Sequence, residues 1–162
     1  MDFKIIKLLV LDFDGVLTNN KVFIDENGKE AVICDRRDGH GIVVLSKDKF
    51  ETIVISNEKS SAIKHRCNKL RVDCFQGIDN KLILLREEIK KRNISAKEVC
   101  YVGNDENDID SIMYAGIGVA VNDAFPEVKK EADYITKNNG GDGAVREVIE
   151  EIIKSKLKNV VT

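Results

Sequence analysis

The sequence lacks several features that would mark a secreted, membrane-bound or nucleic-acid-binding protein. No apolar stretch approaches the roughly 18–20 residues that a membrane-spanning helix needs. The first apolar run, within MDFKIIKLLVLDFDG, has an acid at position 2 and stops at carboxylates, which is typical of a buried first strand and not of a secretory signal. The formal net charge is −2, so there is no basic excess to neutralise the phosphates of a nucleic acid or an anionic membrane. We therefore expect a cytoplasmic protein that binds neither membranes nor nucleic acid.

Cysteine and proline are also scarce. The four cysteines show no CxxC spacing, so a zinc knuckle or a redox motif is not expected, and they are predicted to be reduced thiols. Pro126 is the only proline, and no Ser/Gly-rich linker or internal repeat divides the chain. A length of 162 residues with 43% hydrophobic residues suits one domain, predicted to span residues 1–162.

Short β-branched runs alternate along the chain with amphipathic, charged segments. Strands are predicted at 4–12, 51–56, 72–75, 98–103, 117–121 and 133–136, and helices at 39–48, 59–70, 79–92, 107–115, 125–131 and 142–158. An Asn27-Gly28 pair between alternating apolar residues predicts a β-hairpin at about 20–34. The alternation predicts an α/β fold with a central parallel sheet covered on both faces, and a working site at the carboxyl ends of the strands.

Polar side chains follow the predicted strands or begin the helix at 79–92. They are Asp12, Asp14, Ser56, Asn57, Glu58, Lys81, Asn104, Asp105 and Asp108. Clustered carboxylates repel one another unless a cation neutralises them, and an all-oxygen set of Asp, Asn, carbonyl and water suits Mg²⁺. Lys81 and Ser56 would hold phosphate oxygens by charge and hydrogen bond. One aspartate could then attack phosphorus while the second acts as general acid and base, so the set predicts a phosphoryl-transfer site.

Ordinary structural roles are the alternative for these residues. Asp12 and Asp14 could be a solvated strand end or a helix cap, and Lys81 a surface lysine. The charged run KHRCNKLR could be a solvated helix face, and Asp38 could cap the helix at 39–48. Ser56, Lys81 and the polar cluster at 103–108 occur at matching positions along the chain, and this weighs against a purely structural role for the two aspartates.

The stretch DFDGVLT resembles the first motif, DxDGxxT, of the haloacid dehalogenase superfamily. Ser56, Lys81 and GNDENDID are similar to its second, third and fourth motifs in order and spacing. The resemblance implies a three-layer Rossmann-like fold, with Asp12 as nucleophile and Asp14 as general acid and base. It implies that Mg²⁺ is held by the Asp12 carboxylate, the Asp14 carbonyl and a side chain of the fourth motif. The resemblance leaves open whether Asn104 or Asp105 is that side chain, and it implies that Asp108 lies nearby and contacts the metal through water or supports its ligands.

The spacing of the motifs indicates a particular branch of this superfamily. About 40 residues separate Asp14 from Ser56 and about 20 separate Ser56 from Lys81, which leaves no room for a cap domain. The chain resembles capless sugar-acid phosphatases, and RRDGHGI at 36–42 and GGDGAVREV at 140–148 are similar to stretches in them. By this resemblance the protein is a homotetramer in which a neighbour's hairpin covers the site.

The second motif bears on the substrate. It reads Ser56-Asn57-Glu58-Lys59, whereas phosphatases of 3-deoxy-octulosonate 8-phosphate usually have Thr-Gly-Arg there. This version is similar to that of nonulosonate (KDN or N-acetylneuraminate) 9-phosphate phosphatases. We therefore expect a nonulosonate 9-phosphate as substrate, with the octulosonate phosphate, or a non-catalytic assembly domain related to acylneuraminate cytidylyltransferase, as alternatives. The expected substrate-binding residues are Asn57, Glu58, Arg66 and Lys69.

Overall fold

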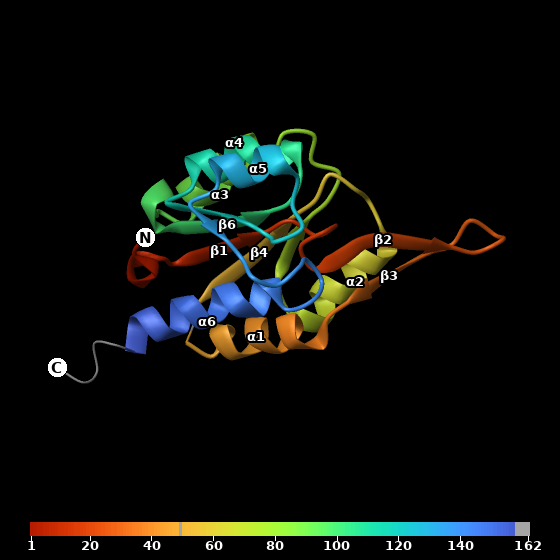
Figure 1. The fold of residues 1–162 in the computed structure, drawn as a ribbon, viewed down its shortest axis with the longest axis horizontal. Coiled ribbons are helices and arrows are strands. Elements are labelled where there is room, and N and C mark those ends of the chain that lie inside the picture. Colours follow the sequence, from red (N-terminus) through yellow and green to blue (C-terminus); the bar gives the residue numbers. More distant parts are fainter. Residues whose placement is uncertain (49, 158–162) are drawn as a thin grey trace.

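The computed structural model describes residues 1–48 and 50–157 and shows a six-stranded sheet between two layers of helices (Figure 1). The strand order is β5-β4-β1-β6-β7-β8, and each pairing between neighbours is parallel. The strands are β1 Leu8–Leu11, β4 Glu51–Ile55, β5 Asp73–Phe75, β6 Val99–Gly103, β7 Ile117–Ala120 and β8 Tyr134–Ile135. The predicted α/β fold with a central parallel sheet is confirmed.

Helices α1, α2 and α6 cover one face of the sheet, and α3, α4 and α5 cover the other (Figure 1). The helices are α1 Arg36–Ser46, α2 Ser61–Leu70, α3 Lys81–Lys91, α4 Ile109–Tyr114, α5 Pro126–Glu131 and α6 Ala144–Leu157, with short 3₁₀ helices at Phe3–Ile5, Ala96–Glu98 and Glu106–Asp108. Because both faces are covered, β1 and β6 are buried along their whole length, which explains their almost unbroken apolar sequences.

The central position of β1 brings three strand ends together. Leu11, the last residue of β1, lies opposite Val54 of β4 and Val102 of β6. Asp12 continues the strand by donating its backbone N–H to the carbonyl of Val102 over 3.0 Å. The polar residues that follow β1, β4 and β6 therefore meet at one edge of the sheet.

The predicted hairpin is confirmed as β2 Thr18–Ile24 and β3 Glu30–Cys34, and it projects from the body of the molecule (Figure 1). Its turn is held by the Asp25 side chain, which accepts the N–H groups of Asn27 and Lys29 at 2.9 and 2.8 Å. Several of its apolar side chains are exposed, among them Phe23 and Ile33 at 69% and 66%. Such exposed apolar side chains are typical of a surface that contacts another molecule.

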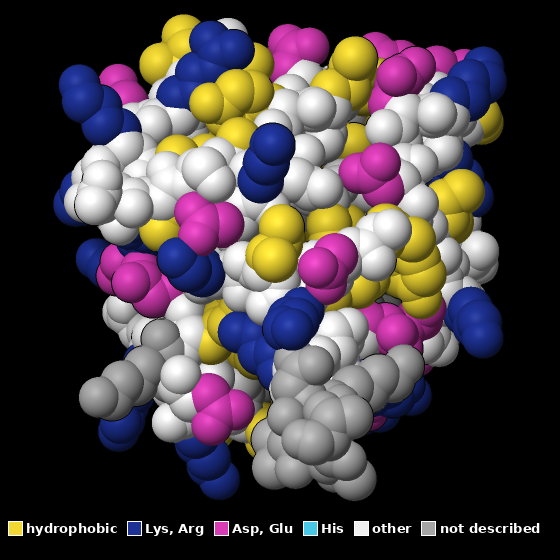
Figure 2. Space-filling model, turned by 90° about the vertical axis from the view of Figure 1, so that its left-hand side faces the viewer, with side chains coloured by type: hydrophobic (Ala, Val, Ile, Leu, Met, Phe, Trp, Pro, Cys, Tyr) yellow, Lys and Arg dark blue, Asp and Glu magenta, His cyan; other side chains and the backbone are white. Residues whose placement is uncertain are grey.

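In the described part of the chain, no cap domain lies between the first and second motifs or between the second and third. The segment between β1 and β4 holds the hairpin and α1, and the segment between β4 and α3 holds α2 and β5. Nor does any helix among the described residues have the length and apolar character needed to cross a membrane. The end of the molecule opposite the hairpin carries acidic and basic side chains interspersed with one another (Figure 2).

Two predicted elements differ from the structure at their starts. The first strand is shorter than 4–12, because Phe3–Ile5 form a 3₁₀ helix whose N-cap is Asp2. The predicted helix at 39–48 begins earlier, at Arg36, because Asp35 and not Asp38 is its N-cap.

The remaining boundaries agree more closely. The predicted helix at 107–115 divides into the 3₁₀ helix Glu106–Asp108 and α4. The final helix, predicted at 142–158, is α6, and residue 158 lies outside the described residues.

Candidate active site

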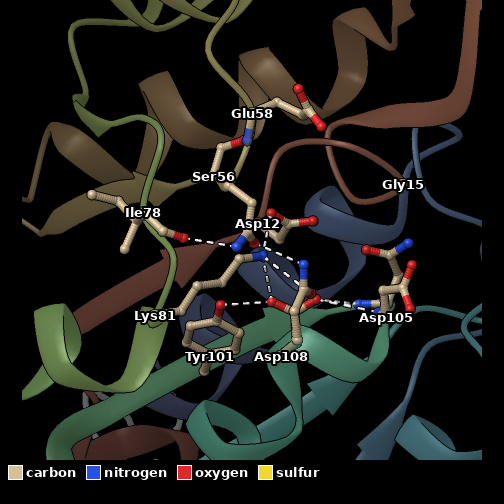
Figure 3. A network of polar contacts seen from close by, with 12 residues as sticks. Asp12, Gly15, Ser56, Glu58, Ile78, Lys81, Tyr101, Asp105 and Asp108 are labelled. Carbon is tan, nitrogen blue, oxygen red and sulfur yellow. Dashed lines mark hydrogen bonds and ion pairs between the residues drawn. The ribbon is translucent and has the colours of Figure 1, made fainter.

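A buried lysine joins the first and fourth motifs. Lys81 is the first residue of α3, where Asn80 caps the helix, and its side chain extends to the segments that follow β1 and β6. Its Nζ lies 2.7 Å from Asp12 Oδ1 and 2.8 Å from Asp108 Oδ1 (Figure 3). Lys81 is 2% exposed, Asp12 5% and Asp108 0%. A surface role for Lys81 is therefore wrong.

Two carboxylates share this one ammonium group, and the imbalance perturbs the protonation of Asp12. Burial and the nearby Asp108 carboxylate raise the pKa of Asp12 to about 7, against the opposing effect of Lys81. Burial by itself would lower the pKa of Lys81, but Asp12 and Asp108 outweigh it and the pKa is raised. The site thus carries excess negative charge next to Asp12, which favours a bound cation.

Asp108 uses its oxygens within the protein. Its Oδ1 accepts the Tyr101 hydroxyl at 2.7 Å in addition to Lys81, and its Oδ2 accepts the backbone N–H groups of Asn104 and Asp105 at 3.0 and 3.3 Å. These contacts hold Lys81 and the loop after β6 in place. The structure therefore places Asp108 as a partner of Lys81, with both of its carboxylate oxygens accepting hydrogen bonds within the protein.

The side-chain amide of Asn104 faces the Asp14 carbonyl oxygen and Asp12 Oδ2, at 2.9 and 3.1 Å. With its NH₂ group turned to this side it donates to both, and with its Oδ1 turned there the three oxygens form an oxygen cluster. Oxygens repel at such distances unless the amide turns and donates to both, or a cation lies among them. In octahedral coordination at 2.0–2.1 Å, neighbouring oxygens of Mg²⁺ are about 3 Å apart, so this oxygen cluster fits Mg²⁺.

The oxygen cluster distinguishes between the two predicted ligands of the fourth motif. The Asp105 carboxylate caps the 3₁₀ helix Glu106–Asp108 and accepts the backbone N–H of Glu106 at 2.7 Å. Asn104 is the side chain that faces Asp12 and Asp14. Only one carboxylate takes part, and among the described residues no three His, Cys, Asp or Glu side chains gather as a metal site.

Asp14 lies beside a cavity at the base of the hairpin. The cavity has a volume of about 240 Å³ and is lined by Asp14, Asn20, Lys21, Val22, Glu30, Val32, Glu58 and Ser60. Burial raises the pKa of Asp14, and the carboxylates of Glu58 and Glu30 raise it further. A raised pKa suits a carboxyl group that must give up a proton as a general acid.

The second motif contributes a buried hydroxyl and a bridging amide. Ser56 is 1% exposed, and its Oγ accepts the backbone N–H of Glu58 at 3.1 Å. Asn57 donates to the Ile78 carbonyl at 2.7 Å and accepts from Asn107 Nδ2 at 2.7 Å. Asn57 therefore ties the loop after β4 to the loops before α3 and after β6.

The other two predicted substrate-binding residues lie elsewhere in this chain. Arg66 and Lys69 share a face of α2, as their spacing predicts, and line a separate pocket of about 360 Å³ with Arg36 and His40. Arg66 also donates to the Asp35 carbonyl at 2.9 Å. The structure does not bring these two side chains into the cavity that Asp14 and Glu58 line.

Sequence reasoning missed two residues that organise the site. Tyr101 holds Asp108 from inside β6, and Asn107 holds Asn57. A tyrosine in a buried strand is more often core than site, but its hydroxyl needs a partner when it is buried. The need of the Tyr101 hydroxyl for a partner, close in sequence to the acidic segment that follows β6, was the signal that could have identified it.

These features define the class of protein, and comparisons with known proteins agree. The family model for haloacid dehalogenase-like hydrolases matches residues 46–149. The chain belongs to this family, and within it to the phosphatases.

Relatives that match this chain over nearly all of its residues belong to one group of these enzymes. The 3-deoxy-D-manno-octulosonate 8-phosphate phosphatase of Escherichia coli (strain K12) is 37% identical over 154 residues, covering 94% of this chain and 82% of that protein. The crystal structure of the phosphatase of that name from Yersinia pestis has a TM-score of 0.94 and 30% identity, covering 99% of this chain and 87% of that one. The structure of the Moraxella catarrhalis phosphatase, in complex with magnesium, phosphate and KDO, has a TM-score of 0.94 and 32% identity, and the match covers 97% of this chain and 91% of that one.

Replacing Gly15 with alanine tests the oxygen cluster. Gly15 has φ +85°, and a Cβ there would lie 2.2 Å from Asn104 Nδ2. We expect Gly15→Ala to lower kcat for phosphate release by at least ~10-fold, because small displacements at a reacting centre are costly. Gly28→Ala is the matched control, since Gly28 has φ +75° but a Cβ there meets nothing within 4 Å. Both variants should lose about 1–3 kcal/mol of stability through backbone strain, and equal activity in the two would contradict the assignment.

Proposed function

We propose that this chain is a Mg²⁺-dependent phosphatase of 3-deoxy-D-manno-octulosonate 8-phosphate. The observation that carries the proposal is the pairing of Asp12 with Lys81 on one side and with the oxygen cluster on the other. Similarity over nearly the whole chain to the Escherichia coli enzyme supports the substrate. That similarity favours the octulosonate phosphate over the nonulosonate 9-phosphate expected from the second motif, and an intact site argues against a non-catalytic assembly domain.

In this proposal each oxygen of Asp12 has its own role. Oδ2 faces the oxygen cluster, and Oδ1 contacts Lys81. Oδ1 attacks phosphorus, the new Asp12 O–P bond forms, and the bond from phosphorus to the sugar oxygen breaks. Asp14 gives its proton to the leaving alkoxide and then takes a proton from the water that attacks phosphorus. This second attack breaks the Asp12 O–P bond and releases inorganic phosphate.

The remaining groups bind and neutralise charge. Lys81 and Ser56 donate to the phosphoryl oxygens. Asp12 Oδ2, the Asp14 carbonyl and the Asn104 side-chain oxygen would hold Mg²⁺, whose charge offsets that of the carboxylates and of the transferred phosphoryl group. Asp105 and Asp108 are not needed as direct ligands in this arrangement.

Metal removal should abolish activity, and metal binding should depend on pH. A chelator should stop phosphate release, and added Mg²⁺ should restore it. Since the pKa of Asp12 is raised to about 7 without metal, protons compete with Mg²⁺ for this carboxylate. We expect the Mg²⁺ dissociation constant, measured by calorimetry, to rise as the pH falls from 8 to 6. Full activity in a chelator, with metal content checked by elemental analysis, would contradict the metal assignment.

The substrate is tested with a panel of phosphates. Phosphate release should be measured for octulosonate 8-phosphate, for KDN and N-acetylneuraminate 9-phosphates, and for a generic aryl phosphate. We expect the octulosonate phosphate to give the highest kcat/KM. A higher value for a nine-carbon acid would support the second candidate, and no turnover of any sugar-acid phosphate would refute both.

Glu58 is the observation that keeps the nonulosonate phosphates as the second candidate. It replaces the usual arginine and lines the cavity beside Asp14. Exchanging one acceptor oxygen for an NH₂ group weakens a hydrogen bond that a sugar hydroxyl donates, so Glu58→Gln should raise KM up to ~10-fold, with little change for the aryl phosphate. Equal effects on both substrates would refute the role of Glu58 in substrate choice.

The same variant should move the pH profile. The Glu58 carboxylate raises the pKa of Asp14, so its removal should lower that pKa. The alkaline limb of kcat/KM, where the protonated acid is lost, should then shift to lower pH. Glu26→Gln, at an exposed position of the hairpin turn, is the control. An unshifted alkaline limb would contradict Asp14 as the general acid.

We also propose that the protein assembles as a homotetramer in which a neighbouring hairpin covers the cavity. The exposed Phe23 and Ile33 of the hairpin support a surface between copies. Arg66 and Lys69, which line a separate pocket in one chain, could then serve substrate binding from across that interface. Sedimentation velocity tests the assembly, and a monomer at assay concentrations would refute it.

A further inference from the structure

Asp38 is a buried carboxylate that the mechanism does not use. It lies in the first turn of α1 with 0% exposure. Its carboxylate points across to the start of α6, where Oδ1 accepts the backbone N–H of Arg146 at 2.8 Å and Oδ2 accepts that of Gly143 at 3.4 Å. The segments RRDGHGI and GGDGAVREV, distant in sequence, therefore meet at this side chain.

The loop 139–143, which Asp38 contacts through Gly143, packs directly against the segment Gly15–Thr18 that follows Asp14. Gly141 donates its backbone N–H to the Val16 carbonyl at 2.9 Å. A Cβ at Gly140 would lie 1.7 Å from the Gly15 carbonyl oxygen, and one at Gly141 would lie 2.3 Å from the Thr18 carbonyl carbon. The two backbones touch with no room for a side chain, so a shift of loop 139–143 must shift Gly15–Thr18.

Further contacts fix the same loop from both sides. Arg37, next to Asp38, forms ion pairs with Asp142 and with Asp35. On the opposite side, Asp123 accepts the backbone N–H of Gly140 at 2.8 Å. The loop is thus held between α1 and the segment after β7, with its glycines turned toward Gly15.

We propose that Asp38 is a positioning residue for the active site. By anchoring loop 139–143, it fixes the backbone at Gly15–Thr18 and so the carbonyl and carboxylate of Asp14. The inference rests on the proposed function, because Asp14 matters in this way only if its carbonyl binds the metal and its carboxyl group moves the proton.

The competing explanation is that Asp38 only caps the start of α6 and has no effect on the active site. The charge of Asp38 helps to separate the two explanations. Burial raises the pKa of Asp38 to about 6, and Asp35 adds to this while Arg37 and the two N–H groups oppose it. With its pKa raised, the folded state binds more protons than the unfolded state between about pH 4 and 6. Stability from this group therefore falls as the pH rises through that window, so its ionised form is unfavourable at neutral pH.

Asp38→Asn is consequently a selective change. The amide keeps one acceptor for Arg146 but presents an NH₂ group to the N–H of Gly143, and it removes the unfavourable buried charge. We expect the melting temperature to stay within a few degrees of the wild type, kcat to fall at least ~10-fold with little change in KM, and the Mg²⁺ dissociation constant to rise several-fold.

Asp133→Asn is the matched control. Asp133 also accepts a backbone N–H, from Gly118 at 2.8 Å, but at the start of β7, away from the carboxyl ends of the strands. It should leave kcat and Mg²⁺ binding unchanged. Gly140→Ala provides a second variant, which presses on the Gly15 carbonyl while leaving Asp38 intact, and should show the same loss of kcat and Mg²⁺ affinity. It carries the test if Asp38→Asn does not fold.

The outcomes separate this inference from the proposed function. Wild-type kcat and wild-type Mg²⁺ affinity in folded Asp38→Asn, or in folded Gly140→Ala if only that variant folds, would overturn the positioning role. If the wild type itself released no phosphate, the proposed function would fail, whereas the Mg²⁺ dissociation constants from calorimetry would still decide whether Asp38 positions the oxygen cluster.

Discussion

Replacing Asp12 with asparagine should abolish turnover and leave the fold intact. A side-chain amide in place of the carboxylate cannot form the covalent phosphoryl bond, so kcat should fall by at least ~10⁴-fold. The fold should persist because asparagine has the same shape and Lys81 keeps its contact with Asp108 at 2.8 Å. Phosphate release and thermal unfolding, measured on the same preparation, check both parts.

The control for this variant is Asp110, the last aspartate of the fourth-motif segment GNDENDID. Asp110 is exposed in the first turn of α4, and Asp110→Asn should retain wild-type activity. Residual turnover near the wild-type rate in Asp12→Asn would remove Asp12 as the nucleophile. Loss of the folded state would instead show that the Asp12 carboxylate is needed for stability.

Replacing Lys81 with methionine should damage both activity and stability. Methionine fills a similar volume but leaves the buried Asp12 and Asp108 carboxylates facing each other without an ammonium group. Breaking a buried ion pair from one side typically costs about 3–5 kcal/mol. Loss of a donor to the phosphoryl oxygens should lower kcat by about 10²–10³-fold in the folded fraction.

The pH dependence gives this prediction a distinctive sign. Without Lys81 the pKa of Asp12 should rise further, because the ammonium group that lowers it is gone. Lowering the pH protonates Asp12 and should shrink the stability deficit relative to the wild type. Lys90→Met, on an exposed position of the same helix α3, is the control. A deficit that grows toward low pH would contradict the account of the network.

The positions of the main catalytic groups could be predicted because parallel strands end at one edge. Asp12, Ser56 and the fourth-motif cluster each follow a strand, so the sheet alone brings them together. The hairpin was predictable from its Asn-Gly turn and alternating residues. In each case a local pattern determined the structure.

Long-range contacts explain what the sequence did not reveal. Asp38 has the spacing of a local helix cap, but its carboxylate turns to residues more than 100 positions away. Tyr101 reads as a core residue of β6 until its hydroxyl is seen on Asp108. Glu58 and the pair Arg66 and Lys69 look like one set in sequence, yet α2 directs the pair into a different pocket.

The substrate choice inferred from the second motif had a similar weakness. Glu58 is one of several residues around the cavity, and Lys21 and Glu30 of the hairpin line it too. A single position therefore cannot determine which sugar acid is bound, and similarity over nearly the whole chain is the better guide.

Trapping the covalent intermediate tests the central claim most directly. The enzyme should be mixed with Mg²⁺ and octulosonate 8-phosphate, quenched in acid within one turnover, and digested for mass spectrometry. The account predicts one phosphoryl group in the segment 8–21, LLVLDFDGVLTNNK, with fragment ions placing it on Asp12. A phosphoryl group on Asp14 or on a residue outside this segment would contradict it.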